Sequence, residues 1–184
     1  MIPPSLAECS EIKILHLWQN SLRGEMPDLG HYENATSLKL SSNKLGGKVP
    51  DSIGRCKSLK TLHLYNNILE GDLPAQLGQC TALEDLRLSR NSFTGSIPPQ
   101  MGACVGLIAL LLDQNRFGGD VPREIGNFVK LRELNLSKNK FTGELPPTIG
   151  NCAKLQKIEL LHNQVVDVAF EPKIHLLNRN RALI

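Results

Sequence analysis

The sequence has few aromatic residues and no long apolar segment. Phe, Trp and Tyr make up 4% of its 184 residues, so a hydrophobic core has to be built from Leu, Ile and Val. The longest uninterrupted apolar run, residues 105–112, has eight residues, whereas a membrane-spanning helix needs about 20. We therefore expect no membrane segment in this chain, and a core that reaches its size by repetition.

Dense charge clusters and a targeting segment are also missing. The net charge is +3 and is spread along the chain, which argues against nucleic acid or a membrane surface as the principal partner. The first residues lack the basic start and the apolar segment of a secretory signal peptide. If the protein is extracellular, we expect the sequence to be an uncapped fragment of a longer one.

An asparagine recurs at a nearly constant spacing and reveals an internal repeat. The step is 24 residues, once 23, and the asparagines are Asn20, Asn43, Asn67, Asn91, Asn115, Asn139 and Asn163. With this asparagine numbered as position 9, leucine-like residues fall at positions 1, 4, 6 and 11. Most repeats continue with glycine at position 13 and proline at position 16. The pattern predicts one domain over residues 1–165, with seven repeats after a partial first coil.

Leucines at positions 4 and 6 lie on one face of a short strand, which pairs in parallel with its counterpart in the next repeat. The rest of each coil then crosses back over the convex side. We therefore predict an α/β-type solenoid with a parallel concave sheet and an irregular or 3-10 convex side. The repeated asparagines are expected to form a structural ladder of hydrogen bonds between coils; the alternative is contact with a ligand.

Two departures from the repeat are informative. One residue is missing between Pro27 and Leu29, which should tighten a convex bend and leave the neighbouring strands in register. The pattern then fails after Val165, where Asp167 replaces the expected glycine. We expect residues 166–184 to form a disordered tail without repeats.

The five cysteines all occupy position 22 and are Cys9, Cys56, Cys80, Cys104 and Cys152. Their side chains should run parallel, with Cβ atoms at the coil spacing, which exceeds the separation of about 3.8 Å usual in a disulfide. We therefore expect free buried thiols. A single row of cysteines offers no converging ligands, so no metal site is predicted.

These recurring positions resemble the plant-specific leucine-rich repeat, LxxLxLxxNxLxGxIPxxLGxCxxL, found in receptor-like kinases and receptor-like proteins. The resemblance covers roughly residues 2–165. It implies a right-handed leucine-rich repeat superhelix at the extracellular face of the plasma membrane, as the recognition module of a receptor-like kinase. Its partners would be a peptide or protein ligand and a co-receptor ectodomain, with no cofactor. The alternatives are a soluble cell-wall inhibitor resembling polygalacturonase-inhibiting protein and a nonfunctional truncated product.

A full-length relative would carry a serine/threonine kinase, but this chain contains no kinase motif and no catalytic triad. We therefore predict that it is not an enzyme. Function is expected on the concave face, where the side chains between the leucines meet solvent. The candidate ligand-binding residues are His16, Trp18, Lys39, His63, Tyr65, Arg87, Arg90 and Asp113.

Trp18 and Tyr65 share position 7 two coils apart, roughly 10 Å, with Ser41 between them. They are expected to flank a slot for an extended peptide; the alternative is a solvated sheet with incidental aromatic residues. Arg87 and Arg90 either clamp a carboxylate or are neutralised by nearby acidic residues. They do not match the Arg-x-Arg pair that the receptor resemblance would imply, because they are three residues apart.

Two N-x-[ST] sequons mark candidate glycosylation sites, at Asn34 and Asn135. Asn135 is at position 5, on the concave strand face, so a glycan there would cover part of the expected binding surface. Asn34 precedes a strand and would interfere less.

Overall fold

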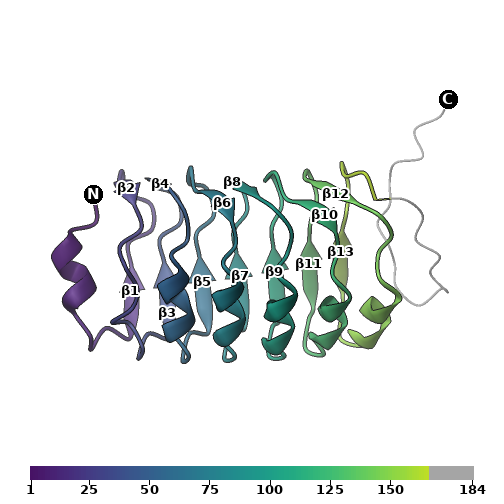
Figure 1. The fold of residues 1–184 in the computed structure, drawn as a ribbon, viewed down its shortest axis with the longest axis horizontal. Helices are drawn as coiled ribbons and strands as arrows, with labels where there is room; N and C mark the ends of the chain where they lie inside the picture. The colour runs from purple at the N-terminus through teal and green to yellow at the C-terminus, as the bar shows by residue number, and fades with distance from the viewer. Residues whose placement is uncertain (166–184) are drawn as a thin grey trace.

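The protein is a solenoid of stacked coils, seen in the computed structural model that describes residues 1–165 (Figure 1). One strand from each coil joins a seven-stranded sheet in the order β1-β3-β5-β7-β9-β11-β13, and every pairing in it is parallel. The strands are β1 (Ile14–His16), β3 (Ser37–Lys39), β5 (Thr61–His63), β7 (Asp85–Arg87), β9 (Ala109–Leu111), β11 (Glu133–Asn135) and β13 (Lys157–Glu159). The predicted solenoid with its parallel sheet is confirmed, whereas the predicted tail lies outside the described residues.

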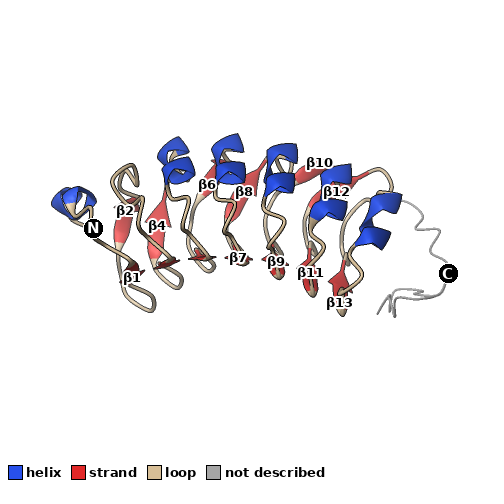
Figure 2. Cartoon of the chain, turned by 90° about the horizontal axis from the view of Figure 1, so that it is seen from below, coloured by secondary structure: helices blue, strands red, loops and turns tan. Residues whose placement is uncertain are grey.

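The sheet lies along the inner side of an arc, and short 3-10 helices lie along the outer side (Figure 2). These helices are η1 (Pro4–Glu8), η2 (Asp51–Arg55), η3 (Ala75–Gln79), η4 (Pro99–Ala103), η5 (Arg123–Asn127) and η6 (Pro147–Asn151). Each begins directly after a proline in extended conformation, such as Pro50 with φ −70°. Helices are wider than strands, so successive coils lie further apart on the helical side than on the sheet side. The stack therefore curves with the sheet on its inner face.

The shorter repeat keeps its strands in register. Leu15 pairs with Leu38 across the 23-residue step just as Leu38 pairs with Leu62 across a 24-residue step. Residues 27–29 have no regular secondary structure and residues 30–31 form a turn, where most later coils have a 3-10 helix. There the backbone N–H of Gly30 donates to the Oδ1 atom of Asp28 at 2.8 Å. The missing residue therefore changes the convex bend and leaves the concave sheet intact.

Short strands on the side of the solenoid were not predicted from the sequence. They form three parallel pairs: β2 (Arg23–Glu25) with β4 (Lys44–Gly46), β6 (Glu70–Asp72) with β8 (Ser92–Thr94), and β10 (Gly118–Asp120) with β12 (Lys140–Thr142). We call this the lateral face. β2, β6 and β10 contain glycine and no apolar side chain, and β4, β8 and β12 contain one buried apolar residue each, so local sequence propensity gives little signal for them. They pair because the repeat brings extended segments of successive coils side by side.

Aliphatic side chains fill the interior, as expected, and three phenylalanines add a stack to it. Phe117 lies between Phe93 and Phe141, with ring centroids 5.9 and 6.1 Å away, and all three are fully buried. Within residues 1–165 all five cysteines are free, and all but one are buried. Cys9 is exposed, contrary to expectation, because no coil among the described residues covers it.

Candidate ligand-binding site

The repeated asparagines lie where each concave strand ends, and their side chains bond to the backbone of two coils. The Oδ1 atom of Asn67 accepts from the N–H of Leu45 at 3.0 Å. Its Nδ2 group donates to the carbonyls of Leu40 and Leu64, each at 3.0 Å. Equivalent bonds recur at Asn43, Asn91, Asn115, Asn139 and Asn163. The side-chain amides of these asparagines are therefore hydrogen-bonded within the solenoid.

Asn20 is the exception in this row. It is exposed, and its Nδ2 group donates to the carbonyls of Leu17 and Trp18, both in its own coil. The asparagine of the first repeat therefore bonds within one coil, whereas the other asparagines bond to two.

The residue just before each of these asparagines has a left-handed backbone conformation. The φ angles of these non-glycine residues lie between 54° and 58°, with Arg90 at 57°. L-residues adopt this region at a cost, so the sharp exit from the strand must be stabilised by the stacked coils. At Arg90 the exit places an exposed guanidinium beside the end of β7.

A shallow pocket opens on the concave face where β5, β7 and β9 end. Its lining residues are Ser42, Tyr65, Asn66, Arg87, Ser89, Arg90 and Leu111. Three predicted residues meet there, namely Tyr65, Arg87 and Arg90. The pocket thus combines an aromatic ring, two guanidinium groups and an aliphatic side chain within four consecutive coils.

Asp85 holds Arg87 in place at the edge of this pocket. The Nε atom of Arg87 donates to Asp85 Oδ1 at 2.9 Å, and His63 Nε2 lies 2.9 Å from Asp85 Oδ2. Burial alone would raise the pKa of Asp85, but the hydrogen bonds from His63 and Arg87 outweigh it, and the pKa is lowered from its usual value. The hydrogen bond to Asp85 also raises the pKa of Arg87. Asp85 is therefore a carboxylate at neutral pH, and Arg87 is fixed by it.

The contact between His63 and Asp85 was missed in the sequence. In the sheet His63 is directly opposite Arg87 on one side and Lys39 on the other, while Asp85 is its diagonal neighbour. Long polar side chains on one face of a sheet reach such diagonal neighbours. The strand register therefore brings His63 and Asp85 within reach of each other, and their side-chain rotamers decide that they bond.

The other predicted ligand-binding residues lie outside the pocket lining. Asp113 accepts hydrogen bonds from Ser89 Oγ and Gln114 Nε2, and within residues 1–165 no salt bridge joins it to Arg90. His16 is bonded to Ser37 Oγ at 2.9 Å. Trp18 is 47% exposed, and Ser41, between it and Tyr65, is buried. The slot between Trp18 and Tyr65 therefore stays a prediction, distinct from the pocket on the far side of Tyr65.

The two sequons differ in their surroundings. The Oδ1 atom of Asn135 accepts from the backbone N–H and the hydroxyl of Ser137 at 3.0 and 2.6 Å, and its Nδ2 group donates to Glu159. Asn34 is exposed and lines a polar hollow with Arg55 and Lys57. A glycan on Asn135 would disturb its bond to Glu159, whereas one on Asn34 would point into solvent. Modification of either asparagine stays a prediction.

Within the described range, no helix combines the length and hydrophobicity needed to cross a membrane. The same residues contain no group of three or more His, Cys, Asp or Glu side chains that would hold a metal ion.

Leucine-rich repeat family models match two parts of the chain, residues 33–93 and residues 130–152. A search of curated proteins finds no match. Solved structures do match. The plant peptide hormone receptor RGFR1, in complex with RGF2, is 39% identical, with a TM-score of 0.87 over 89% of this chain and 27% of the receptor chain. The Arabidopsis receptor kinase HAESA, in complex with the peptide hormone IDA and the co-receptor SERK1, is 32% identical, with a TM-score of 0.85 over 88% of this chain and 27% of that one.

A plant ice-binding protein is also similar, at 32% identity and a TM-score of 0.76, over 87% of this chain and 53% of that one. The coil geometry is therefore shared by proteins with different ligands, and the side chains on its surface must decide the function. This chain spans about a quarter of the two receptor chains, at 27% of each. By repeat pattern, family models and fold, the chain belongs to the leucine-rich repeat proteins, and the solved structures it resembles include the ectodomains of plant receptor kinases.

Proposed function

We propose that this chain is part of the extracellular ligand-sensing region of a plant receptor-like kinase, and that it binds a peptide without catalysing a reaction. The observation that carries the proposal is the concave pocket lined by Tyr65, Arg87, Arg90 and Leu111. The similarity to receptors solved with peptide hormones supports it.

The chemistry of the pocket favours an extended peptide with an acidic group beside an apolar side chain. Arg87 is held by Asp85 through Nε, and within residues 1–165 Arg90 forms no salt bridge. A fixed guanidinium loses little side-chain entropy when it binds a carboxylate. Tyr65 and Leu111 supply the apolar contact, and aromatic residues with arginines are the residue types that most often anchor partners.

Partners beyond the ligand follow from the same proposal. In the HAESA complex a peptide hormone and a co-receptor are bound together. We propose that the receptor containing this chain likewise engages a co-receptor ectodomain outside the cell. The coding sequence around this chain discriminates between the alternatives: a downstream membrane helix and kinase would support a receptor, and a cysteine-capped end with a stop codon would support a soluble inhibitor.

Peptide binding can be tested directly with the purified chain. An array of synthetic plant secreted peptides is probed with the wild-type protein, and positive peptides are measured again by isothermal titration calorimetry. We expect Tyr65→Ala and the double variant Arg87→Gln/Arg90→Gln to weaken binding at least tenfold, because each removes an anchor from the pocket. Trp18→Ala tests whether the ligand extends into the predicted slot.

Arg123→Gln is the matched control, since Arg123 lies on the convex side in η5 and its side chain is 84% exposed. It should leave the affinity unchanged. Trp18→Ala, Tyr65→Ala and Arg123→Gln should keep the free energy of unfolding within about 0.5 kcal/mol of the wild type. The double variant should lose more stability, because it also removes the hydrogen bonds from Arg87 to Asp85, so its fold is checked by circular dichroism. Equal affinity of the wild type and both pocket variants for every bound peptide would overturn the proposed site.

A further inference from the structure

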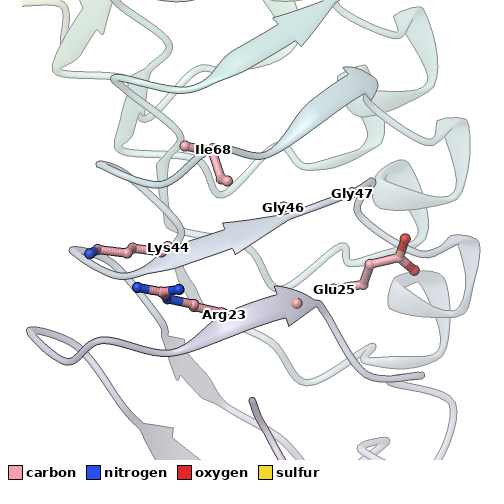
Figure 3. Close-up of a pocket in the computed structure, with 7 residues that line it drawn as sticks. Arg23, Glu25, Lys44, Gly46, Gly47 and Ile68 are labelled. Atoms are coloured by element: carbon pink, nitrogen blue, oxygen red, sulfur yellow. The ribbon is translucent and has the colours of Figure 1, made fainter.

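A second pocket lies on the lateral face, away from the concave sheet (Figure 3). It is formed by β2 and β4 and by Ile68, which follows the repeat asparagine of the next coil. Its lining residues are Arg23, Gly24, Glu25, Lys44, Gly46, Gly47 and Ile68. The concave site proposed above shares none of these residues.

Two cations face each other across this pair of strands. Arg23 and Lys44 are directly opposite in the parallel register, and no salt bridge involves either within residues 1–165. Figure 3 shows their side chains side by side and extending in the same direction, while Glu25 points away at the other end of the strands. Like charges directly opposite in a sheet are destabilising. An anionic group from outside would remove this repulsion.

The lateral pairs elsewhere do not repeat this arrangement. The matching positions are Glu70 opposite Ser92 and Gly118 opposite Lys140. The paired cations therefore do not follow from the repeat, unlike the asparagine row or the glycine turns.

A missing side chain creates the hollow beside the cations. Gly46 occupies a position that carries threonine in two later coils, at Thr94 and Thr142. A Cβ atom on Gly46 would be 3.7 Å from Ile68 Cδ1, an ordinary contact, so the site has room for a side chain that the sequence omits. Ile68 forms the apolar wall and is 63% exposed. Burying so exposed an isoleucine is favourable for whichever group enters.

We infer that this lateral pocket is a docking site for an acidic loop of a partner protein, which places a Glu or Asp carboxylate between Arg23 and Lys44 and a neighbouring apolar side chain on Gly46 and Ile68. The cations call for an anion, and the apolar wall favours a peptide over an anionic polysaccharide, which has no aliphatic side chain to bury.

The test uses the whole 184-residue chain, labelled with ¹⁵N, and two probes. One is a synthetic peptide with alternating Glu and Leu, and the other is polygalacturonate. We expect the peptide to shift the amide resonances of Gly46, Gly47 and Ile68. Arg23→Gln/Lys44→Gln should weaken this binding about five- to tenfold, and Gly46→Thr should do the same by filling the hollow.

Matched controls come from the other end of the lateral face. Lys140→Gln removes a cation that faces Gly118, and Gly118→Thr adds a side chain at the equivalent glycine. Both should leave peptide binding unchanged. The inference is overturned if the peptide shifts no lateral resonances, if the control variants weaken binding as much as the pocket variants do, or if polygalacturonate binds the site and the peptide does not.

Discussion

At the scale of single residues, the asparagine of each repeat joins two coils. The amide of Asn91 accepts from Leu69 N–H at 3.0 Å and donates to Leu64 and Leu88 carbonyls at 3.0 Å. Leu64 and Leu69 belong to the preceding coil and Leu88 to its own. One side chain therefore satisfies backbone groups that neither coil satisfies alone.

We predict that Asn91→Ala lowers the free energy of unfolding by about 2–4 kcal/mol, because it leaves several enclosed backbone groups without partners, at about 1–3 kcal/mol each. Asn20→Ala is the internal control, since Asn20 is exposed and bonds only within its own coil. It should lose less than about 1 kcal/mol. Urea unfolding followed by circular dichroism measures both, and equal losses would contradict the two-coil role.

At the scale of elements, the sequence predicts strands better than it predicts what connects them. Leucines two residues apart, such as Leu86 and Leu88, identify the concave strands and their inward face, with Ile158 in place of the first leucine at β13. The lateral strands escape prediction because they rest on backbone pairing between coils and contain at most one apolar residue each, too few for an alternating pattern. Residues 27–31 form an irregular segment with a turn at residues 30–31, in place of a 3-10 helix, because one residue is missing. The sequence shows where this change lies but not its geometry.

The candidate site, too, could be predicted from the sequence only in part. Repeat position predicts that Tyr65, Arg87 and Arg90 lie on the concave face. The pocket itself depends on rotamers and on hydrogen bonds such as His63 to Asp85, which involve residues 22 apart in the sequence. Which exposed residues converge is therefore decided by side-chain contacts, and repeat numbering does not contain them.

The phenylalanine stack allows a prediction at this scale. Phe117→Ala should destabilise the protein by about 3–5 kcal/mol, because it opens a cavity between two buried rings. Phe117→Leu should cost about 1–1.5 kcal/mol, since two earlier coils have leucine at this position, Leu45 and Leu69, and the volume change is modest. Chemical denaturation of the two variants gives the comparison. If leucine costs as much as alanine, aromatic stacking, and not volume, holds these coils together.

At the scale of the whole molecule, a row of buried thiols links stability to alkaline pH. Burial raises the pKa of Cys56 to about 11, of Cys80 to about 12 and of Cys104 to about 11, from a usual value of 9.0. Below pH 9 all three are protonated in both the folded and the unfolded chain. Above it the unfolded chain releases protons that the folded chain keeps, so the unfolded state is favoured as pH rises.

We therefore expect the free energy of unfolding to fall between pH 9 and 11, by at most about 1.4 kcal/mol per pH unit for each thiol. Cys80→Ala should remove about one quarter of the thiol-dependent slope, because Cys152 is buried as well and burial also raises its pKa. The slope is measured by urea titration under reducing conditions. Cys9→Ala, at the exposed cysteine, should leave the slope unchanged. If the two variants retain the same pH dependence, the buried thiols are not its source.

The concave pocket takes its lining from four successive coils, with Ser42, Tyr65, Arg87 and Leu111 each from a different one. In a stack where each coil touches only its neighbours, opening can begin at either end and spread coil by coil. A bound peptide would contact coils that are not adjacent and would oppose their separation along the axis of the solenoid. Peptide binding would then slow amide hydrogen exchange throughout the coils that the peptide spans, including amides that do not contact it.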